Sequence, residues 1–334
     1  MITFPSLRPF VSVVMPAYNG ERFISAALDS VCGEDAERIE LVVVDDVSSD
    51  RTLDIVRDYA KLLPIRLITP GRIGNWVTAT NLGLREARGD WACFLHQDDL
   101  WLPGRIARLR GEMEKAEGAL VLHNAMFVGP DGQRLGPWTC PLPEGVVPPD
   151  QFLEHLLVQN FIAIPSPLFR RTAAIDSGGL DEALWYTADW DLWLRLGAMG
   201  PIRFIADTLC AFRVHPASQT VTHSLRPGEW EQQLTTVFLR HFPRWNATGK
   251  RRAMVEEVAM ASVAVNAALA AASRGEPLRW KGPLLKLLAL GPSGWRRYLR
   301  DSRIVERVGA RLKARRSNAC SNSVPTVPRL SARP

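Results

Sequence analysis

Two adjacent carboxylates at positions 98 and 99 could bind a metal. Asp98 and Asp99 follow the apolar run 92–95, so they stand where a buried strand would end. Paired carboxylates recruit hard divalent cations, and Mg²⁺ or Mn²⁺ typically binds through one or two of them together with substrate phosphates. Such a metal would neutralise the charge that develops on a departing diphosphate. The alternative is a solvated acidic turn without a ligand.

A second acidic segment, residues 45–50, follows the apolar run 41–44. At the end of that strand, Asp45 and Asp46 could accept hydrogen bonds from a nucleobase or a ribose. Aspartate and serine also favour turns and helix starts, so a plain turn with Asp50 as the helix cap is the alternative. The segment alone leaves both interpretations open.

Four further residues are candidates for contact with a substrate. Asp189 opens the amphipathic pattern 188–199, where a carboxylate is either a general base for an acceptor hydroxyl or a favourable charge at a helix start. Arg213 and His215 end a predicted strand and offer a fixed cation and an imidazole to a negatively charged substrate, or have only structural roles. Trp190 could stack on a sugar, although aromatic residues near a helix are more often core.

Strands that alternate with helices must position these loops. Apolar runs predict strands over 11–15, 41–44, 65–68 and 91–95, and helical spacing predicts helices over 21–31, after Asp50 and over 76–87. This alternation indicates an α/β fold made of βαβ units around a mainly parallel sheet. Because ligands bind outside the carboxyl ends of such strands, the loops 17–20, 45–50 and 96–99 should converge on one crevice.

The remaining chain divides into three predicted parts. Residues 1–225 would form the catalytic domain, with a nucleotide-binding half over about 10–130 and an acceptor half over 131–225. The acceptor half contains a Pro-rich connection over 137–149, helices over 150–157 and 188–199, and strands over 202–205 and 209–214. Residues 226–316 would be a helical extension with helices over 229–242, 251–273, 284–290 and 295–312. The Ser/Pro/Arg-rich residues 317–334 predict a disordered tail.

Composition limits the class of protein. An apolar share of 46% and a charged share of 23% are ordinary for a globular protein, and five cysteines without a CxxC spacing indicate a reducing compartment. No secretory signal is visible, and the most apolar window, 258–272, is shorter than the ~20 residues of a spanning helix. We therefore expect a cytoplasmic protein without a transmembrane helix.

The order of the motifs resembles a family-two glycosyltransferase of the GT-A fold. Residues 11–19 resemble the opening strand and nucleotide loop of that family, 41–50 its acidic nucleotide segment, and 94–101 its metal motif. Segments 81–90, 166–171, 178–182, 188–196 and 212–216 follow in the family's order. The resemblance covers about residues 10–220 and implies a Rossmann-like GT-A sheet flanked by helices, with a helical C-terminal extension.

The resemblance also implies roles for individual residues. Asp189 would be the catalytic base, and Asp98, Asp99 and His215 would hold Mn²⁺ or Mg²⁺. His96, Arg213 and Trp190 would contact the diphosphate or the acceptor. The donor nucleotide would be bound by Pro16, Ala17, Tyr18, Asn19, Asp45, Asp46, Asn81 and Gln97.

Two positions depart from the family pattern. The metal motif commonly begins with Asp where this chain has His96, and the acceptor motif commonly has Glu-Asp where this chain has Ala188 and Asp189. These departures bear on metal affinity and on the geometry of the acceptor.

The implied activity is inverting transfer of a sugar from a nucleotide-diphosphate sugar to a hydroxyl of a glycan or lipid-linked acceptor, in surface polysaccharide or lipopolysaccharide synthesis. One alternative is a non-catalytic protein that binds nucleotide sugars or acts as a scaffold. The other is a sugar nucleotidyltransferase, which would need a Gly-rich, basic phosphate loop that residues 16–20 do not provide.

Charge is distributed unevenly along the chain. Residues 241–334 contain 19 Lys or Arg against 5 Asp or Glu, which leaves 22 against 30 for residues 1–240. Basic amphipathic helices of this kind can lie on anionic lipid, so we expect a peripheral position on the inner face of the cell membrane. The alternative is a solvated face of an extension that packs on the catalytic domain. We find no nucleic-acid recognition motif and expect no nucleic-acid partner.

Overall fold

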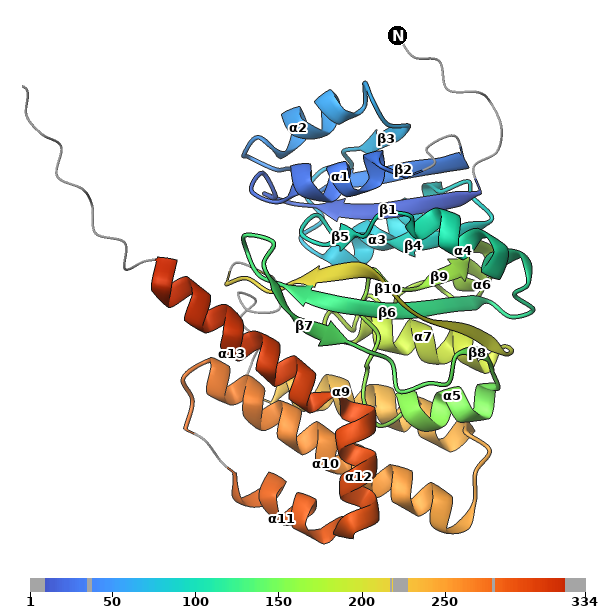
Figure 1. Cartoon of the computed structure of the whole chain (residues 1–334), viewed down its shortest axis with the longest axis vertical. Coiled ribbons are helices and arrows are strands. Elements are labelled where there is room, and N and C mark those ends of the chain that lie inside the picture. The colour runs from blue at the N-terminus through green and yellow to red at the C-terminus, as the bar shows by residue number, and fades with distance from the viewer. Residues whose placement is uncertain (1–9, 35–37, 217, 219–227, 278–279, 322–334) are drawn as a thin grey trace, which may run out of the picture.

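The computed structural model describes residues 10–34, 38–216, 218, 228–277 and 280–321. A sheet with flanking helices occupies the upper part of the molecule in Figure 1, and the C-terminal helices gather below it. The predicted α/β class is therefore confirmed.

Within the described residues, ten strands form one mixed sheet in the order β3-β2-β1-β4-β9-β6-β10-β5, with β7 on β6 and β8 on β10. The first four strands of this order run parallel, as do β6 and β10, while β9 pairs antiparallel with both β4 and β6. The strands are β1 (Val11–Ala17), β2 (Ile39–Asp45), β3 (Ile65–Ile68), β4 (Trp91–Phe94), β5 (Leu100–Trp101), β6 (Leu120–Val128), β7 (Arg134–Trp138), β8 (Gly145–Val147), β9 (Leu168–Arg170) and β10 (Ile202–Arg213).

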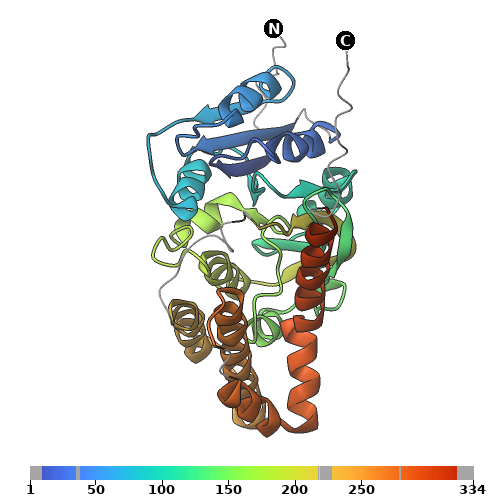
Figure 2. The same cartoon turned by 90° about the vertical axis from the view of Figure 1, so that its left-hand side faces the viewer.

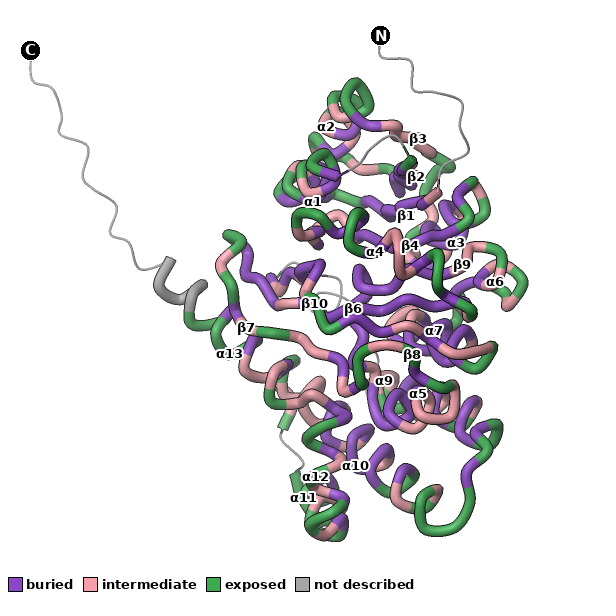
Figure 3. The backbone as a smooth tube through the Cα atoms, turned by 45° about the vertical axis from the view of Figure 1, so that its right-hand side comes forward, coloured by how far each residue is buried: buried purple, intermediate pink, exposed green. Residues whose placement is uncertain are grey.

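Helices cover both faces of this sheet, so its strands are apolar on both sides. Val13 and Met15 of β1 belong to one buried cluster, whereas Val14 belongs to another on the opposite face, as the two-residue period of a strand requires. Figure 3 shows the central strands as almost continuously buried. The helices that surround the sheet are α1 (Ile24–Cys32), α2 (Thr52–Tyr59), α3 (Trp76–Glu86), α4 (Arg105–Glu114), α5 (Pro149–Leu156), α6 (Arg171–Asp176) and α7 (Ala188–Ala198).

One glycine allows α3 to approach the sheet closely. A Cβ at Gly83 would lie 2.5 Å from Cγ1 of Val14 and 3.2 Å from Cγ2 of Val44. Any larger residue would push the helix away from β1 and β2, whose carboxyl ends support the first two loops of the site.

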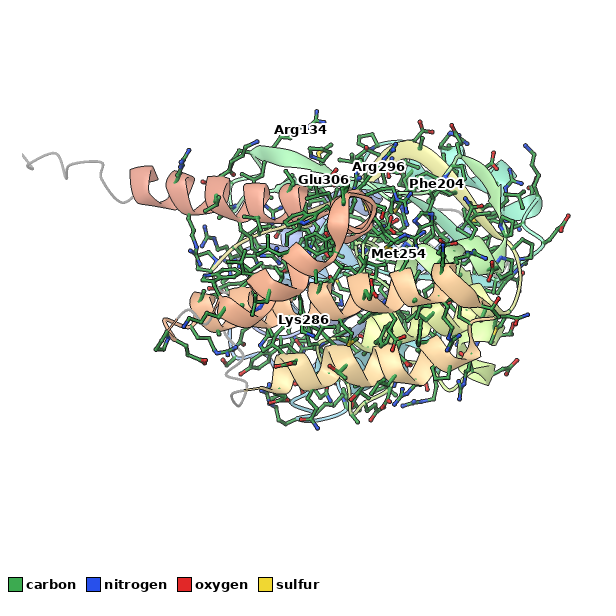
Figure 4. All side chains as sticks on the ribbon, turned by 90° about the horizontal axis from the view of Figure 1, so that it is seen from below. Arg134, Phe204, Met254, Lys286, Arg296 and Glu306 are labelled. Atoms are coloured by element: carbon green, nitrogen blue, oxygen red, sulfur yellow. The ribbon has the colours of Figure 1, made fainter. Side chains whose placement is uncertain are left out.

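The C-terminal helices continue the core of the sheet domain. They are α9 (Glu229–His241), the 3₁₀ turn Phe242–Arg244, α10 (Gly249–Ser273), α11 (Lys281–Ala289), α12 (Gly291–Ser302) and α13 (Ile304–Ser321). Phe238 of α9, Val255 of α10 and Tyr298 of α12 belong to the same buried cluster as Val14 of β1. Figure 4, seen from below, shows these helices layered against the sheet.

Three predictions about the elements were wrong. The predicted helix 295–312 is broken where Arg303 adopts a left-handed φ of 50°, which lets α13 turn and run along β7 (Figures 1 and 2). The connection 137–149 contains the end of β7 and all of β8. The segments 202–205 and 209–214 form one strand, β10, with an irregularity between Ile205 and Cys210.

Two expectations about the C-terminal region also need revision. Helix α13 runs to Ser321, into the first residues of the expected disordered tail, and the rest of that tail, residues 322–334, lies outside the described part. By length and composition, α10 is long and apolar enough to cross a membrane, with a mean hydropathy of 1.4 in its most apolar window. Half of that window is buried inside the protein, as in the core helix of a globular domain.

Candidate active site

A cavity of about 610 Å³ lies at the carboxyl end of the sheet. The loops after β1, β2, β4 and β10 reach it from the sheet, the start of α7 and the segment 159–164 form another wall, and α13 contributes from the C-terminal extension. The expected convergence of the strand-end loops is therefore found. Predicted site residues that line the cavity are Pro16, Ala17, Tyr18, Asn19, Asp46, His96, Gln97, Asp98, Asp189, Trp190 and His215.

The loop after β1 is fixed by side chains from two other loops. Gln97 accepts a hydrogen bond from the backbone N–H of Tyr18 at 2.9 Å and donates one to its carbonyl at 3.0 Å. Asn19, in a left-handed conformation with φ 46°, accepts the N–H of Ser49, and its own N–H bonds the hydroxyl of Ser48. These bonds hold the exposed ring of Tyr18 at the cavity.

The two aspartates after β2 have different surroundings. Asp45 accepts the N–H and hydroxyl of Ser48, lies outside the cavity lining and has the geometry of a turn. Asp46 faces the cavity, where its carboxylate accepts the backbone N–H groups of Ile73 and Gly74. The guanidinium of Arg72 lies 3.3 Å from Asp46 Oδ2 and its carbon 3.9 Å from the centre of the Tyr18 ring. Asp46 thus connects the loop 71–75 to the loop after β2 at the cavity.

Asn81 does not reach this cavity, contrary to its expected part in donor binding. Its amide donates to the carbonyl of Leu180 and to Glu182, and its oxygen accepts the N–H of Leu180. The side chain lines a separate, shallow depression. Its role is therefore to join α3 to the turn before α7.

His96, Asp98 and Asp99 form a group that can hold a metal ion, because their ligand atoms all lie within 4.8 Å of one another. Nε2 of His215 lies 2.9 Å from Oδ2 of Asp98. Within the described residues, Nε2 of His96 and Oδ2 of Asp99 are buried without a hydrogen-bond partner. Buried, unpartnered ligand atoms suit a divalent cation, so these residues fit the expected metal.

The electrostatics of the group agree with this fit. Burial and the adjacent charge of Asp98 raise the pKa of Asp99 well above its usual range. Burial alone would raise the pKa of Asp98, but the hydrogen bond from His215 holds it below its usual value. Burial lowers the pKa of His96, which favours the neutral imidazole that binds metals. A cation here would compensate two neighbouring carboxylates.

Arg213 lies behind the metal group and does not line the cavity. Its Nε donates to the carbonyl of Asp98, and its Nη1 donates to the carbonyls of Gly129 and Pro130. Its backbone N–H donates to Oδ1 of Asp99 at 3.0 Å. Arg213 is thus a positioning residue for the 98–99 turn, and its expected contact with a diphosphate does not fit this geometry.

Asp189 faces the cavity from the start of α7. Its Oδ2 accepts a hydrogen bond from Asn160 Nδ2 at 2.9 Å, and its Oδ1 accepts the N–H of Trp190 at 2.8 Å. Burial raises the pKa of Asp189 to about 6, because its effect is larger than that of the hydrogen bonds, which lower the pKa. A carboxylate with this pKa is charged at neutral pH and basic enough to take a proton from a hydroxyl. The ring of Trp190 is buried and donates to the carbonyl of Leu156, so little of it is free for a sugar.

Several cavity residues were not predicted from the sequence. Asn160 and Tyr186 lie in irregular segments without a motif, and Arg72 lies in the loop before α3. Arg307 and Arg311 come from α13, where their spacing of four residues places them on one helix face. That spacing was the only signal for them in the sequence.

The sheet, the crevice at its carboxyl ends and the paired carboxylates define a GT-A glycosyltransferase. The profile described as "Glycosyl transferase family 2" matches residues 12–155. A relative from Rickettsia typhi, described as an uncharacterized glycosyltransferase, is 30% identical over 245 residues that cover 70% of this chain and 72% of the relative. A second from Rickettsia prowazekii is 29% identical with the same coverage. The chain therefore belongs to glycosyltransferase family 2.

Solved structures agree in fold. S. aureus TarS in complex with UDP-GlcNAc is similar with a TM-score of 0.66 and 17% identity, covering 93% of this chain and 91% of TarS. The mannosyltransferase PcManGT from Pyrobaculum calidifontis, in complex with GDP-Man and Mn²⁺, is similar with a TM-score of 0.50 and 20% identity, covering 92% and 88%. Both similarities include the C-terminal helical region.

Proposed function

We propose that this glycosyltransferase moves a sugar from a nucleoside-diphosphate sugar to an acceptor hydroxyl with inversion at the anomeric carbon. The observation that carries the proposal is the set of carboxylates in the cavity. Among the described residues these are Asp46, Asp98 and Asp189. Asp46 pairs with the guanidinium of Arg72, and Asp98 contacts His215 in the group that fits a metal. The donors to Asp189 are instead the neutral groups of Asn160 and Trp190, so we assign proton transfer to Asp189. A single displacement with one base inverts configuration, whereas a double displacement needs a separate nucleophile.

The donor would bind along the wall formed by the loops after β1, β2 and β4. The exposed Tyr18 ring and the loop fixed by Asp46 can contact the base and ribose. His96, Asp98 and Asp99, with His215 beside them, would hold Mn²⁺ or Mg²⁺. When bound, the divalent cation neutralises charge on the leaving diphosphate. PcManGT, whose structure contains GDP-Man and Mn²⁺, supports this assignment by its similar fold.

The acceptor would approach from the side of α7. Asp189 removes the proton of its hydroxyl as the oxygen bonds to the anomeric carbon. The bond from that carbon to the donor phosphate oxygen breaks, and its electron pair leaves with the nucleoside diphosphate. Asn160 holds the Asp189 carboxylate in place during this step.

Stereochemistry tests the proposal most directly. The anomeric configuration of the transferred sugar can be measured by NMR, from the coupling constant of the anomeric proton in the product. We expect the configuration opposite to that of the donor. Retention of configuration would contradict the assignment of Asp189 as the base of a single displacement.

We propose further that the enzyme acts at the cytoplasmic face of a membrane on a glycan or lipid-linked acceptor of a surface polysaccharide or lipopolysaccharide. Helix α11 supports this, because Leu284, Leu285 and Leu288 are 52%, 66% and 63% exposed beside the exposed Lys281 and Lys286. Figure 4 shows Lys286 on the outer surface of the C-terminal helices. Apolar and basic side chains on one exposed helix favour an anionic lipid surface.

Sedimentation with vesicles tests this surface. The protein should bind vesicles that contain phosphatidylglycerol more tightly than neutral vesicles, and Lys281→Glu with Lys286→Glu should abolish the difference. The matched control, Lys61→Glu with Lys250→Glu, changes the same charge at exposed sites outside α11. Equal loss of binding in both double variants would exclude α11 as the membrane contact.

A further inference from the structure

Two arginines of the C-terminal helix α13 line the same cavity as Asp189. Arg307 and Arg311 are one helical turn apart, and both contribute to the cavity wall. They come from the region outside the family profile, which ends at residue 155. The extension is thus part of the site.

Helix α13 is fixed against the catalytic domain at several points. Glu306 accepts both the N–H and the hydroxyl of Thr139 at 3.0 Å, and Lys313 donates to the carbonyl of Leu135 at 2.8 Å. Ala310 and Ala314 pack into a small buried cluster with Phe127 and Leu135. These contacts place the face of α13 that bears the two arginines toward the cavity.

Arg307 is buried and only partly satisfied. The residue is 7% exposed, and its Nη2 donates to Oδ1 of Asn266 at 3.1 Å. Asn266 is itself held by Gln159, which accepts a hydrogen bond from the Asn266 amide at 2.8 Å. Within the described residues, Nη1 of Arg307 is buried without a partner. A buried guanidinium with an unused donor indicates an anionic ligand, because a charged donor without a partner is costly.

Arg311 adds a second positive charge beside the first. Its Nη1 donates to the carbonyl of Arg307 at 3.2 Å. Neither arginine forms an ion pair with a carboxylate among the described residues. Arg311 is an exposed residue at the edge of the cavity, and the surrounding protein atoms and the like charge of Arg307 lower its pKa to about 10. Two uncompensated cations therefore face the cavity together.

The pair belongs to the acceptor side of the cavity. Arg307 and Tyr186 line the same cavity as Asp189. Asn160, which holds Asp189, directly follows Gln159, the residue that positions Asn266. The donor side is instead formed by Tyr18, Asp46 and the metal group. A ligand that contacts both arginines would therefore belong to the molecule whose hydroxyl Asp189 deprotonates.

We infer that Arg307 and Arg311 form a subsite for a phosphate or pyrophosphate group of the acceptor. The inference rests on the proposed role of Asp189. A carboxylate carries one negative charge and would leave one arginine uncompensated, whereas a phosphate monoester carries about −1.5 to −2 and a pyrophosphate diester carries two charges. The planar fork of arginine matches phosphate oxygens in a way that a lysine would not. The acceptor is then a sugar phosphate or a sugar linked to lipid through pyrophosphate.

Direct binding separates this subsite from the donor site. The nucleotide site is first saturated with Mn²⁺ and the nucleoside diphosphate that the enzyme binds, and dodecyl diphosphate, glucose 1-phosphate and neutral dodecyl glucoside are then titrated by calorimetry. We expect the phosphorylated probes to bind more tightly than the glucoside. Tighter binding of dodecyl diphosphate would identify a lipid-linked acceptor, and tighter binding of glucose 1-phosphate a free sugar phosphate.

Substitutions then assign the binding to α13. Arg307→Gln and Arg311→Gln should each weaken binding of the preferred phosphorylated probe about ten- to hundredfold, the loss expected for a hydrogen bond to a charged group. Arg316→Gln removes one charge from the same helix at an exposed position outside the cavity lining and should change binding less than threefold. Arg307→Lys keeps the charge in the buried position and controls for folding, and it should weaken binding by an intermediate factor.

Other results would overturn the inference in distinguishable ways. Equal binding of the phosphorylated probes and the neutral glucoside, or unchanged binding in Arg311→Gln, would exclude the subsite. Hydrolysis of the nucleotide sugar by water, measured in the same variants, reports on the donor site and Asp189 without an acceptor. Normal hydrolysis with unchanged phosphate binding would reject the subsite alone, whereas hydrolysis that is unaffected by Asp189→Asn would reject the proposed function as well.

Discussion

Asn160 donates its side-chain amide to Oδ2 of Asp189 at 2.9 Å, across a separation of 29 residues in the chain. The oxygen of the same Asn160 side chain accepts the N–H of Ile162 at 3.1 Å, so the amide cannot turn over without losing this bond. The Asp189 carboxylate therefore meets a fixed donor, and its orientation toward the cavity does not depend on a bound substrate.

The first prediction concerns the pH dependence of turnover. Because Asp189 must be deprotonated to accept a proton and its pKa is raised to about 6, kcat should fall as the pH drops through about 6. The measurement is kcat for nucleotide-sugar turnover between about pH 5 and 8. Asn160→Ala removes a hydrogen bond that lowers this pKa, so the acidic limb should move to higher pH. A limb that stays in place in this variant would argue against Asp189 as the titrating group.

The second prediction concerns stability. A carboxylate whose pKa is raised on folding binds more protons in the folded state, so its contribution to stability is lost as the pH rises through the folded pKa. From about pH 4.5 to 7, the free energy of unfolding of the wild type should fall by about 2 kcal/mol relative to Asp189→Asn. Denaturant unfolding at the two pH values measures this difference. If the difference in free energy of unfolding between the wild type and Asp189→Asn were the same at both pH values, Asp189 would have an ordinary pKa.

The third prediction concerns donor binding. If the nucleobase of the donor stacks on Tyr18, Tyr18→Ala should raise the KM for the nucleotide sugar about tenfold or more. Stacking of a nucleobase on an aromatic ring contributes about 1–3 kcal/mol. Tyr18→Phe keeps the ring and should leave KM nearly unchanged, because the ring hydroxyl takes no part in the two bonds from Gln97. Initial rates over a range of donor concentrations provide the test. An equal effect of the two substitutions would exclude stacking.

The fourth prediction separates structure from binding at Asn81. Asn81→Ala should lower the free energy of unfolding by about 1–3 kcal/mol, because it leaves the buried N–H and carbonyl of Leu180 without partners. The KM for the donor should not change, since the side chain lies outside the main cavity. A large rise in KM without loss of stability would restore the donor-binding role that the family resemblance implies.

The strands, the helices between them and the cavity positions of Asp46, Asp98 and Asp189 could be predicted because their signals are local. Each continuous apolar run ends in a polar loop, and parallel strands bring those loops to one edge, as Asp46 and Asp98 show. The acceptor side could not be predicted in this way. Asn160 meets Asp189, and Arg307 meets Asn266, only through packing of segments distant in the chain. The break between α12 and α13 occurs at Arg303 and directs α13 toward the cavity. The sequence has no glycine or proline at this position that would predict the break.

The central claim is that Asp98 holds a metal on the donor and Asp189 is the base. The most direct measurement is a mass-spectrometric screen of nucleotide-sugar turnover by the purified protein with Mn²⁺ or Mg²⁺, with EDTA, and in the variants Asp98→Ala and Asp189→Asn. We predict metal-dependent release of one nucleoside diphosphate, lost in EDTA and in both variants, with Asp189→Asn still binding the donor. Turnover that persists in EDTA and in Asp98→Ala would contradict the metal site, and turnover that persists in Asp189→Asn would contradict the base.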